Sequence, residues 1–254
     1  MPNLKTLLIS GAVALGAMTA QPGALLADVN NIVLVHGANI DGTTWRKVYD
    51  SLADDEYSVT VVQLPMTSVE DDIAAVRRII GIQEGPMILV GHSYGGLVIG
   101  EAGDDPNVRG LVYVAAFQPD VGESTGALSA SMPTGFTGDT IRIFEDGHYL
   151  VNEDAWLSFV ANGLSDEEAL FTARSQAASN LSIFAYESTT AAWNDKPSWS
   201  AIATDDGVIA PDLQRQMAER AGSTVVEIEN GHMLPMTSPD EVADVIRQAA
   251  SAVE

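Results

Sequence analysis

Short apolar runs alternate with helical patterns from residue 31 to the end of the chain, and this alternation restricts the possible fold more than any other feature. The runs typical of strands are 31–36, 57–64, 86–91, 108–117, 198–204 and 223–229. Apolar residues at helical spacing follow most of these runs, for example in 70–80 and 239–253. Strands that alternate with helices predict a mostly parallel sheet with helices on both faces. We therefore expect an α/β fold with a sheet of about six strands.

One long segment interrupts the alternation between the fourth and fifth strands. It runs from about residue 118 to 196 and is too long for a loop inside a compact domain. Helical patterns around 154–164 and 166–189 predict that it forms a small helical cap over the ends of the strands. Aromatic side chains in this segment, among them Trp156, suit the lining of an apolar pocket.

The N-terminal segment has the layout of a secretory signal peptide. Lys5 precedes a run of apolar or small residues from Leu7 to Met18, and Ala-rich sequence follows. The run is too short to span a bilayer comfortably. We expect cleavage after Ala27, with Ala20 as the alternative. A signal peptide of residues 1–27 would leave one domain of residues 28–254, periplasmic or secreted and with no membrane association.

The composition restricts the partners. The chain has no cysteine, so we expect neither disulfides nor thiolate-bound metal. It has 35 Asp and Glu against 12 Lys and Arg, a formal net charge of −23. Because phosphate binding requires clustered cations, we expect no nucleic-acid partner. The acidic residues are dispersed, as on a solvated surface, and the sequence indicates no particular oligomeric state.

The stretch 88–103, ILVGHSYGGLVIGEAG, joins a strand directly to a helix through Gly-X-Ser-X-Gly. Such a turn is so sharp that its serine adopts strained backbone angles and presents its hydroxyl to the cleft. Gly91 and Gly95 leave room for the close approach of strand and helix. The pattern indicates that Ser93 is a nucleophile rather than part of an ordinary glycine-rich turn.

A serine nucleophile needs a base, and four histidines are available. His36 ends the first strand, where such a residue more often braces a loop, and His92 points away from the serine on the turn. His148 lies in the cap, on its surface or lining the pocket. His232 follows the last strand in a loop ahead of the final helix, which makes it the expected base.

The base in turn needs a carboxylate to orient it. Asp205 and Asp206 follow the penultimate strand and complete the chain order Ser, Asp, His. We expect Asp206 to take this role, with Asp205 and Asp120 as alternatives. The oxyanion hole needs two backbone N–H groups, which Ala38 on the first loop and Tyr94 after the nucleophile are placed to supply.

Four segments together, VLVHGANIDGTTW, LVGHSYGG, TDDGVIAPDLQRQMAERAG and NGHMLPMTSPDEV, resemble the α/β-hydrolase superfamily. They are especially similar to its small capped branch of plant methylesterases, hydroxynitrile lyases and bacterial esterase relatives. The resemblance extends from Asn31 to the C-terminus and is weakest in the cap. It implies an α/β-hydrolase fold and a serine hydrolase with Ser93, Asp206 and His232 as triad.

Within that branch, the resemblance favours hydrolysis over cyanohydrin cleavage. The lyases carry a threonine where this chain has Gly37 and a lysine where it has Met233. Asn39 departs from the plant pattern, which bears on the choice of substrate. We therefore expect Gly37, Asn39, Met233 and Trp156 to contact the substrate.

The expected function is hydrolysis of carboxylic esters of small apolar molecules through an acyl-enzyme on Ser93, which makes the chain a carboxylesterase-type hydrolase. The expected partner is a small-molecule ester, and the chemistry requires neither metal nor organic cofactor. Two alternatives stay open. One is a lactonase or perhydrolase that uses the same triad, and the other is a non-catalytic ligand-binding module of the same fold.

Overall fold

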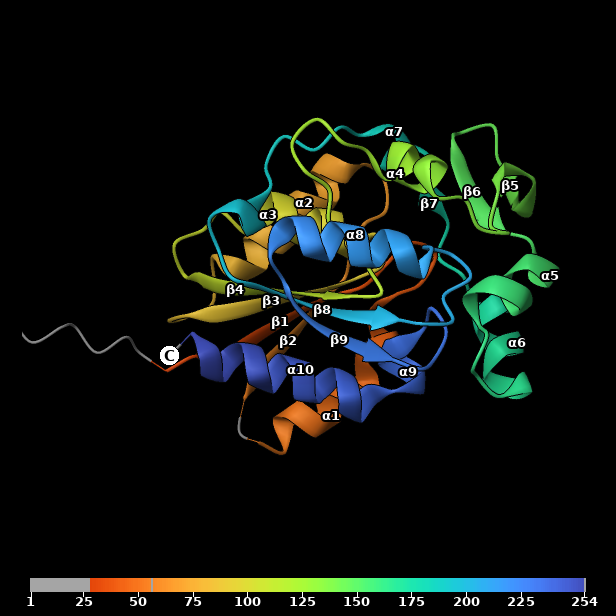
Figure 1. Cartoon of the computed structure of the whole chain (residues 1–254). Coiled ribbons are helices and arrows are strands. Elements are labelled where there is room, and N and C mark those ends of the chain that lie inside the picture. The colour runs from red at the N-terminus through yellow and green to blue at the C-terminus, as the bar shows by residue number, and fades with distance from the viewer. Residues whose placement is uncertain (1–27, 56, 254) are drawn as a thin grey trace, which may run out of the picture.

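The computed structural model of this protein describes residues 28–55 and 57–253. The predicted signal peptide, residues 1–27, lies outside the described residues. The main sheet has six parallel strands in the order β2-β1-β3-β4-β8-β9 (Figure 1). Its strands are β1 (Asn31–Val35), β2 (Ser58–Val62), β3 (Met87–His92), β4 (Val108–Val114), β8 (Ser198–Ala203) and β9 (Thr224–Ile228).

Helices cover both faces of this sheet, so the predicted mostly parallel α/β architecture is confirmed. In Figure 1, α2, α3 and α8 lie on one face, whereas α1 and α10 lie on the other. The helices of this part are α1 (Arg46–Ala53), α2 (Val69–Ile80), α3 (Gly95–Ala102), α8 (Pro211–Ala221), α9 (Leu234–Thr237) and α10 (Pro239–Ala252), with a 3-10 turn η1 (Gly42–Trp45).

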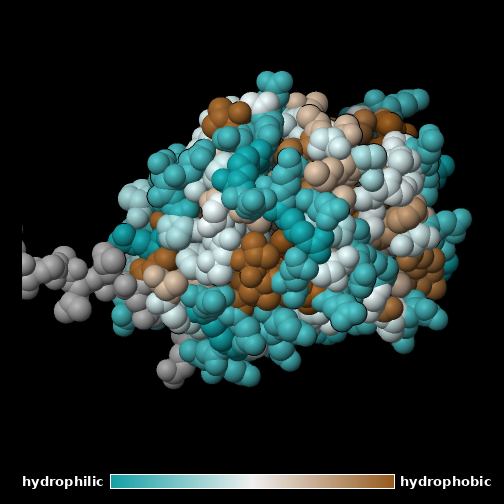
Figure 2. Space-filling view, in the orientation of Figure 1, coloured by the Kyte–Doolittle hydropathy of each residue, from teal (hydrophilic) through white to brown (hydrophobic). Residues whose placement is uncertain are grey.

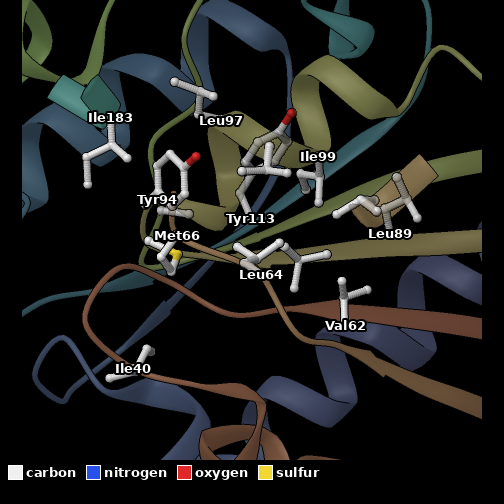
Figure 3. Packing of buried hydrophobic residues seen from close by; sticks show 14 of the residues in the cluster. Ile40, Val62, Leu64, Met66, Leu89, Tyr94, Leu97, Ile99, Tyr113 and Ile183 are labelled. Atoms are coloured by element: carbon white, nitrogen blue, oxygen red, sulfur yellow. The ribbon is translucent and has the colours of Figure 1, made fainter. Parts of the chain in front are cut away.

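The two faces have separate apolar cores because successive side chains of a strand point in opposite directions. In β1, Val33 and Val35 pack into the core under α2 and α3, whereas Ile32 and Leu34 pack into the core under α1 and α10. Both faces are buried, which explains the continuous apolar runs of the central strands. Figure 3 shows that the first core continues beyond the sheet to Ile183.

The segment between β4 and β8 is built from short helices and a small antiparallel sheet of order β5-β6-β7. We call residues 118–196 the cap. Its elements are α4 (Thr125–Ser131), η2 (Gly138–Thr140), β5 (Ile141–Ile143), β6 (His148–Val151), α5 (Glu153–Ala155), the π-helix η3 (Trp156–Val160), α6 (Asp166–Arg174), β7 (Ser179–Asn180), α7 (Ser182–Ala185) and η4 (Ala192–Asn194).

The small sheet departs from the helical pattern expected over 166–189. That pattern breaks after Arg174 because the side chain of Gln176 pairs with the backbone of Val151, accepting from its N–H and donating to its carbonyl oxygen, both at 2.9 Å. Asn180 then donates its backbone N–H to Met66 O at 3.0 Å. These contacts across the fold outweigh local helix propensity.

The outer surface in Figure 2 is predominantly hydrophilic, including the exposed sides of α8 and α10, and its apolar residues form separate patches. Within the described ranges, no helix has the length and apolar character needed to cross a membrane.

Candidate active site

Ser93 occupies the sharp turn between β3 and α3, at the centre of the main sheet. Its φ is +54°, a left-handed conformation that a residue with a Cβ rarely adopts. The surrounding backbone holds it there, since Ser93 O accepts hydrogen bonds from Gly96 N at 3.0 Å and Phe117 N at 3.1 Å. The strained serine predicted from the sequence is confirmed.

Glycines make this turn possible because main-chain atoms pass where side chains would be. A Cβ on Gly95 would lie 2.7 Å from Val35 O, and one on Gly91 would lie 2.5 Å from Gly95 O. A Cβ on Gly96 would meet Phe117 O even more closely, at 2.1 Å. Helix α3 can therefore start directly beside β1 and β3 only with glycine at these positions.

The structure brings Ser93, His232 and Asp206 together from three distant segments. His232 Nε2 lies 3.0 Å from Ser93 Oγ, and His232 Nδ1 lies 2.8 Å from Asp206 Oδ2. Because the carboxylate can only accept, Nδ1 carries the proton and Nε2 is free to accept one from the hydroxyl. All three side chains are buried, with 4 to 8% of each residue exposed.

Of the three aspartates considered from the sequence, only Asp206 contacts the imidazole. Asp205 is exposed, and the Asp120 carboxylate instead accepts from Val121 N and Asn194 Nδ2. Asp206 Oδ1 accepts from the backbone N–H groups of Val208 and Ile209 at 2.8 and 2.9 Å.

A residue that the sequence reasoning missed completes this arrangement. Gln214, in α8, donates a 2.8 Å hydrogen bond from Nε2 to Asp206 Oδ2. The carboxylate thus accepts four hydrogen bonds, which suits a buried negative charge. The sequence signal for it was its spacing, since Gln214 lies three and four residues before Met217 and Ala218 and so shares the apolar side of the helix.

The other three histidines have different partners. His36 donates from Nδ1 to Gly37 O at 2.8 Å and accepts from Leu64 N at 3.0 Å, so it braces the loop as predicted. His92 Nε2 donates to His232 O at 2.9 Å, and burial lowers the pKa of its imidazole to about 3. His148 lies on β6 and pairs with Asp146.

The backbone N–H groups of Ala38 and Tyr94, the two expected oxyanion donors, make no backbone hydrogen bond among the described residues. Both residues line the same cavity as Ser93. The Tyr94 ring packs with Met66 and Leu97 (Figure 3), and its hydroxyl donates to Asp72 Oδ2 at 2.8 Å. Asp72 also accepts from Met66 N, so the residue after the serine is tied firmly to α2.

A mainly apolar cavity of about 420 Å³ lies between Ser93 and the cap. This volume is within the range of small-molecule sites, roughly 300–1,000 Å³. Its apolar lining residues are Ala38, Ile40, Phe117, Ala130, Pro133, Phe136, Ile141, Tyr149, Val151, Trp156, Val160, Ile183, Phe184, Val208 and Met233. Among the described residues, no group of three or more His, Asp or Glu side chains is placed to hold a metal ion.

Three of the four residues expected to contact substrate line this cavity: Asn39, Met233 and Trp156. Gly37 lies instead behind Ser93, where a Cβ would be 2.8 Å from the serine Cβ, so its role is to leave room. Trp156 donates its indole N–H to Thr172 Oγ1 at 3.0 Å, which orients its ring in the cap.

Although Asn39 lines the cavity, most of its polar groups bind the protein. Its Nδ2 donates to Tyr149 O at 3.0 Å and to Ala177 O at 3.3 Å, and its backbone N–H donates to Ser179 Oγ at 2.8 Å. It adopts φ +60°, which asparagine tolerates better than most residues. Asn39 therefore connects the cap to the loop that contains Ala38.

A model of the Alpha/beta hydrolase family matches residues 32–245, which include every residue of the site described above. The chain belongs to the alpha/beta hydrolase family. The resemblance expected from the sequence is thereby confirmed, and membership extends across both the sheet and the cap.

Individual hydrolases and esterases are similar to this chain in sequence or in fold. The alpha/beta hydrolase nvfD of Aspergillus novofumigatus is 28% identical over 244 residues, which covers 86% of this chain and 96% of that protein. The carbendazim hydrolyzing esterase of Nocardioides sp. is 38% identical over 112 residues, 39% of this chain and 46% of its own length. The crystal structure of polyneuridine aldehyde esterase has a TM-score of 0.76 at 18% identity, over 87% of this chain and 98% of that one, a likeness of fold.

Proposed function

We propose that this protein is a carboxylesterase-type serine hydrolase that cleaves carboxylic esters of small apolar molecules through an acyl-enzyme on Ser93. The observation that carries the proposal is the chain of hydrogen bonds from Ser93 Oγ to His232 and on to Asp206, at 3.0 and 2.8 Å. A serine with a base in reach and a carboxylate behind the base is the arrangement that activates a hydroxyl for acyl transfer.

In the first step, Ser93 Oγ attacks the ester carbonyl carbon while His232 Nε2 takes the hydroxyl proton. The carbonyl electron pair moves to the oxygen, which becomes an oxyanion. The tetrahedral intermediate then collapses, the bond to the alcohol oxygen breaks, and His232 returns the proton to the leaving alkoxide. Asp206 keeps Nδ1 protonated and stabilises the imidazolium between these two transfers.

The N–H groups of Ala38 and Tyr94 are the proposed donors to the oxyanion. Their lack of backbone partners among the described residues supports this role, because such an N–H at a cavity wall is free to bind a developing charge. Loss of one such donor typically lowers kcat by about 100-fold or more.

In the second step, water replaces the alcohol. His232 takes a proton from water as its oxygen attacks the acyl carbon, and the collapse of the second intermediate returns a proton to Ser93 Oγ. The products are the free acid and the regenerated enzyme.

The apolar cavity supports a substrate that is largely hydrophobic and of modest size. The names of two similar proteins, a carbendazim hydrolyzing esterase and polyneuridine aldehyde esterase, agree with ester hydrolysis. Met233, at the cavity wall directly after His232, provides an apolar surface rather than a cation, which also favours acyl transfer.

The test compares Ser93→Ala with Ser158→Ala, a serine exposed on the cap and outside the cavity lining. We expect Ser93→Ala to abolish turnover of short p-nitrophenyl esters and labelling by a fluorophosphonate probe, with an unchanged circular dichroism spectrum, whereas Ser158→Ala keeps both activities. Unchanged turnover in Ser93→Ala would refute the assignment. Rates of lactone hydrolysis test the lactonase alternative, and rates of ester cleavage with peroxide in place of water test the perhydrolase alternative. A burst of one product equivalent without further turnover indicates the binding module.

We also propose that the mature enzyme begins after Ala27 and acts in the periplasm or outside the cell. Val29 is already buried in the core under α1 and α10, which supports a folded domain that starts near this position. The intact mass of the exported protein tests it, since retention of residues 1–27 would contradict cleavage.

A further inference from the structure

The cavity over Ser93 has no lysine or arginine side chain among its described lining residues. Within the described ranges, its lining includes no Lys, Arg, Asp or Glu. The polar lining residues other than histidine are neutral: Asn39, Ser93, Tyr94, Ser129 and the threonines 125, 134 and 137. An anionic group that enters this space therefore loses its water without gaining a cation.

The two histidines of the cavity do not supply a positive charge to the substrate. Burial, with the neighbouring His232 as a second cause, keeps the pKa of His92 low, so this imidazole is neutral at neutral pH. His232 must be unprotonated to accept the Ser93 proton, and the negative Asp206 lies directly behind it. In the part of the chain that the structure describes, the carboxylate that contacts His232 is thus a negative charge.

The cations nearest in sequence to the lining have other partners or lie on the surface. Arg142 follows the lining residue Ile141 in β5, and because successive side chains of a strand alternate, it lies on the opposite, exposed side. Arg46 is exposed and pairs with Asp50 at 2.8 Å, and Lys47 is exposed and donates to Glu168 and to Met236 O. With a formal net charge of −23, the rest of the chain adds to the repulsion of anions.

Building on the proposed ester hydrolysis, we propose that this site accepts only esters whose acyl and alcohol parts are both uncharged, and that it stops after the first cleavage of a short symmetrical diester. In that cleavage, one ester bond and one water are consumed, and one alcohol and one monoester acid are formed. The new carboxylic acid releases its proton to solvent at neutral pH. The remaining ester then carries an anion that the cavity cannot hold.

The physical cause is desolvation. Burial of a carboxylate without a partner is strongly unfavourable, whereas a neutral ester or amide loses far less. Because the acid and the remaining ester of a five-carbon diacid are close together and Ser93 is buried, we expect the carboxylate to enter the cavity when the ester carbonyl reaches Ser93. We expect kcat/KM for the monoester to be lower than for the diester by about 100-fold or more.

The experiment measures kcat/KM of the full enzyme at pH 7.5 for three substrates: dimethyl glutarate, monomethyl glutarate and the methyl ester of glutaric acid monoamide. The amide matches the size and polarity of the monoester without its charge. We expect rapid cleavage of the diester with one acid equivalent formed, measurable cleavage of the amide, and almost none of the monoester. Cleavage of the monoester within about threefold of the amide would overturn the inference.

A second comparison tests the charge directly. Thr137 lines the cavity and is exposed, so it lies where the cavity meets solvent. We expect Thr137→Arg to raise the monoester-to-diester ratio of kcat/KM about tenfold over Thr137→Gln, because the guanidinium pairs with a carboxylate. A ratio no higher than in Thr137→Gln would overturn the inference.

These outcomes are separable from failure of the proposed function. If the enzyme cleaves none of these esters and the fluorophosphonate probe does not label Ser93, ester hydrolysis itself is refuted, and this inference with it. If the probe labels Ser93 and diester and monoester are cleaved equally, only the charge discrimination is refuted.

Discussion

Gln214 and His232 contact the same oxygen of Asp206, each at 2.8 Å. The Gln214 amide also donates to Ile209 O at 2.9 Å, and its Oε1 accepts from Ala203 N at 3.3 Å. One buried side chain thus ties the carboxylate to the end of β8 and to the loop that follows. The orientation of His232 depends on this carboxylate, so Gln214 positions His232 indirectly by holding Asp206.

We expect Gln214→Met to lower kcat for p-nitrophenyl acetate by about tenfold with KM changed less than twofold. The variant keeps the volume of the side chain but leaves the Ala203 N–H and one Asp206 oxygen short of a partner, which also costs about 1–3 kcal/mol of unfolding free energy. Gln216→Met, exposed on the same helix, is the control. A kcat equal to that of the control would show that Asp206 does not need this contact.

Asp72 makes stability depend on pH. It is fully buried, and burial raises the pKa of its carboxyl to about 6, although hydrogen bonds from Met66 and Tyr94 oppose the shift. Between the unfolded value of 3.8 and about 6, the folded chain keeps a proton that the unfolded chain releases. The contribution of this group to stability is therefore present below pH 3.8 and decreases as the pH rises to 6.

We expect Asp72→Asn to remove this dependence, because the amide oxygen can still accept from Met66 N and the amide N–H can donate to the Tyr94 hydroxyl oxygen. Relative to wild type, the variant should gain about 2 kcal/mol of unfolding free energy between pH 4 and pH 7, because the roughly 2-unit difference in pKa is lost. Urea unfolding at both pH values measures it, with the exposed Glu70→Gln as control. A constant difference across this range would contradict the prediction.

Asn39 combines a left-handed backbone with hydrogen bonds to the cap, and two variants separate these contributions. Asn39→Gly tolerates φ +60° but loses the amide, whereas Asn39→Ala loses the amide and adds strain. We expect both to be less stable than wild type in urea, and Asn39→Ala to be lower than Asn39→Gly by about 1–2 kcal/mol. Equal stability of the two variants would argue against backbone strain at this position.

Gly95→Ala tests the close approach of α3 to β1. The new methyl group would lie 2.7 and 2.8 Å from two main-chain carbonyl oxygens, which cannot move without shifting the strand. We expect loss of soluble folded protein or a fall in melting temperature of about 10 °C or more, since overpacking against backbone exceeds the usual 1–3 kcal/mol. Gly138→Ala, with nothing within 4 Å, should melt within about 2 °C of wild type. A fall in melting temperature of only a few degrees in Gly95→Ala would contradict the prediction, because it would mean that the backbone of β1 can shift to make room for the methyl group.

The sequence determined the features that depend on neighbouring residues. The periods of apolar residues predicted the order of strands and helices, and the glycine spacing around Ser93 predicted its strained turn. His232 could be selected because its place after the last strand sets it at the same edge of the sheet as the serine. Each of these follows from backbone geometry that is decided within a few residues.

The tertiary structure decided everything that depends on contacts between distant segments. It selected Asp206 over Asp205 and Asp120, placed Gln214 behind it, and linked the cavity residue Asn39 to the cap. The β5-β6-β7 sheet formed because Gln176 and Asn180 found partners far along the chain. A single sequence shows which side chains are able to donate or accept a hydrogen bond, but the choice among possible partners is made by the packing that removes water from most of them.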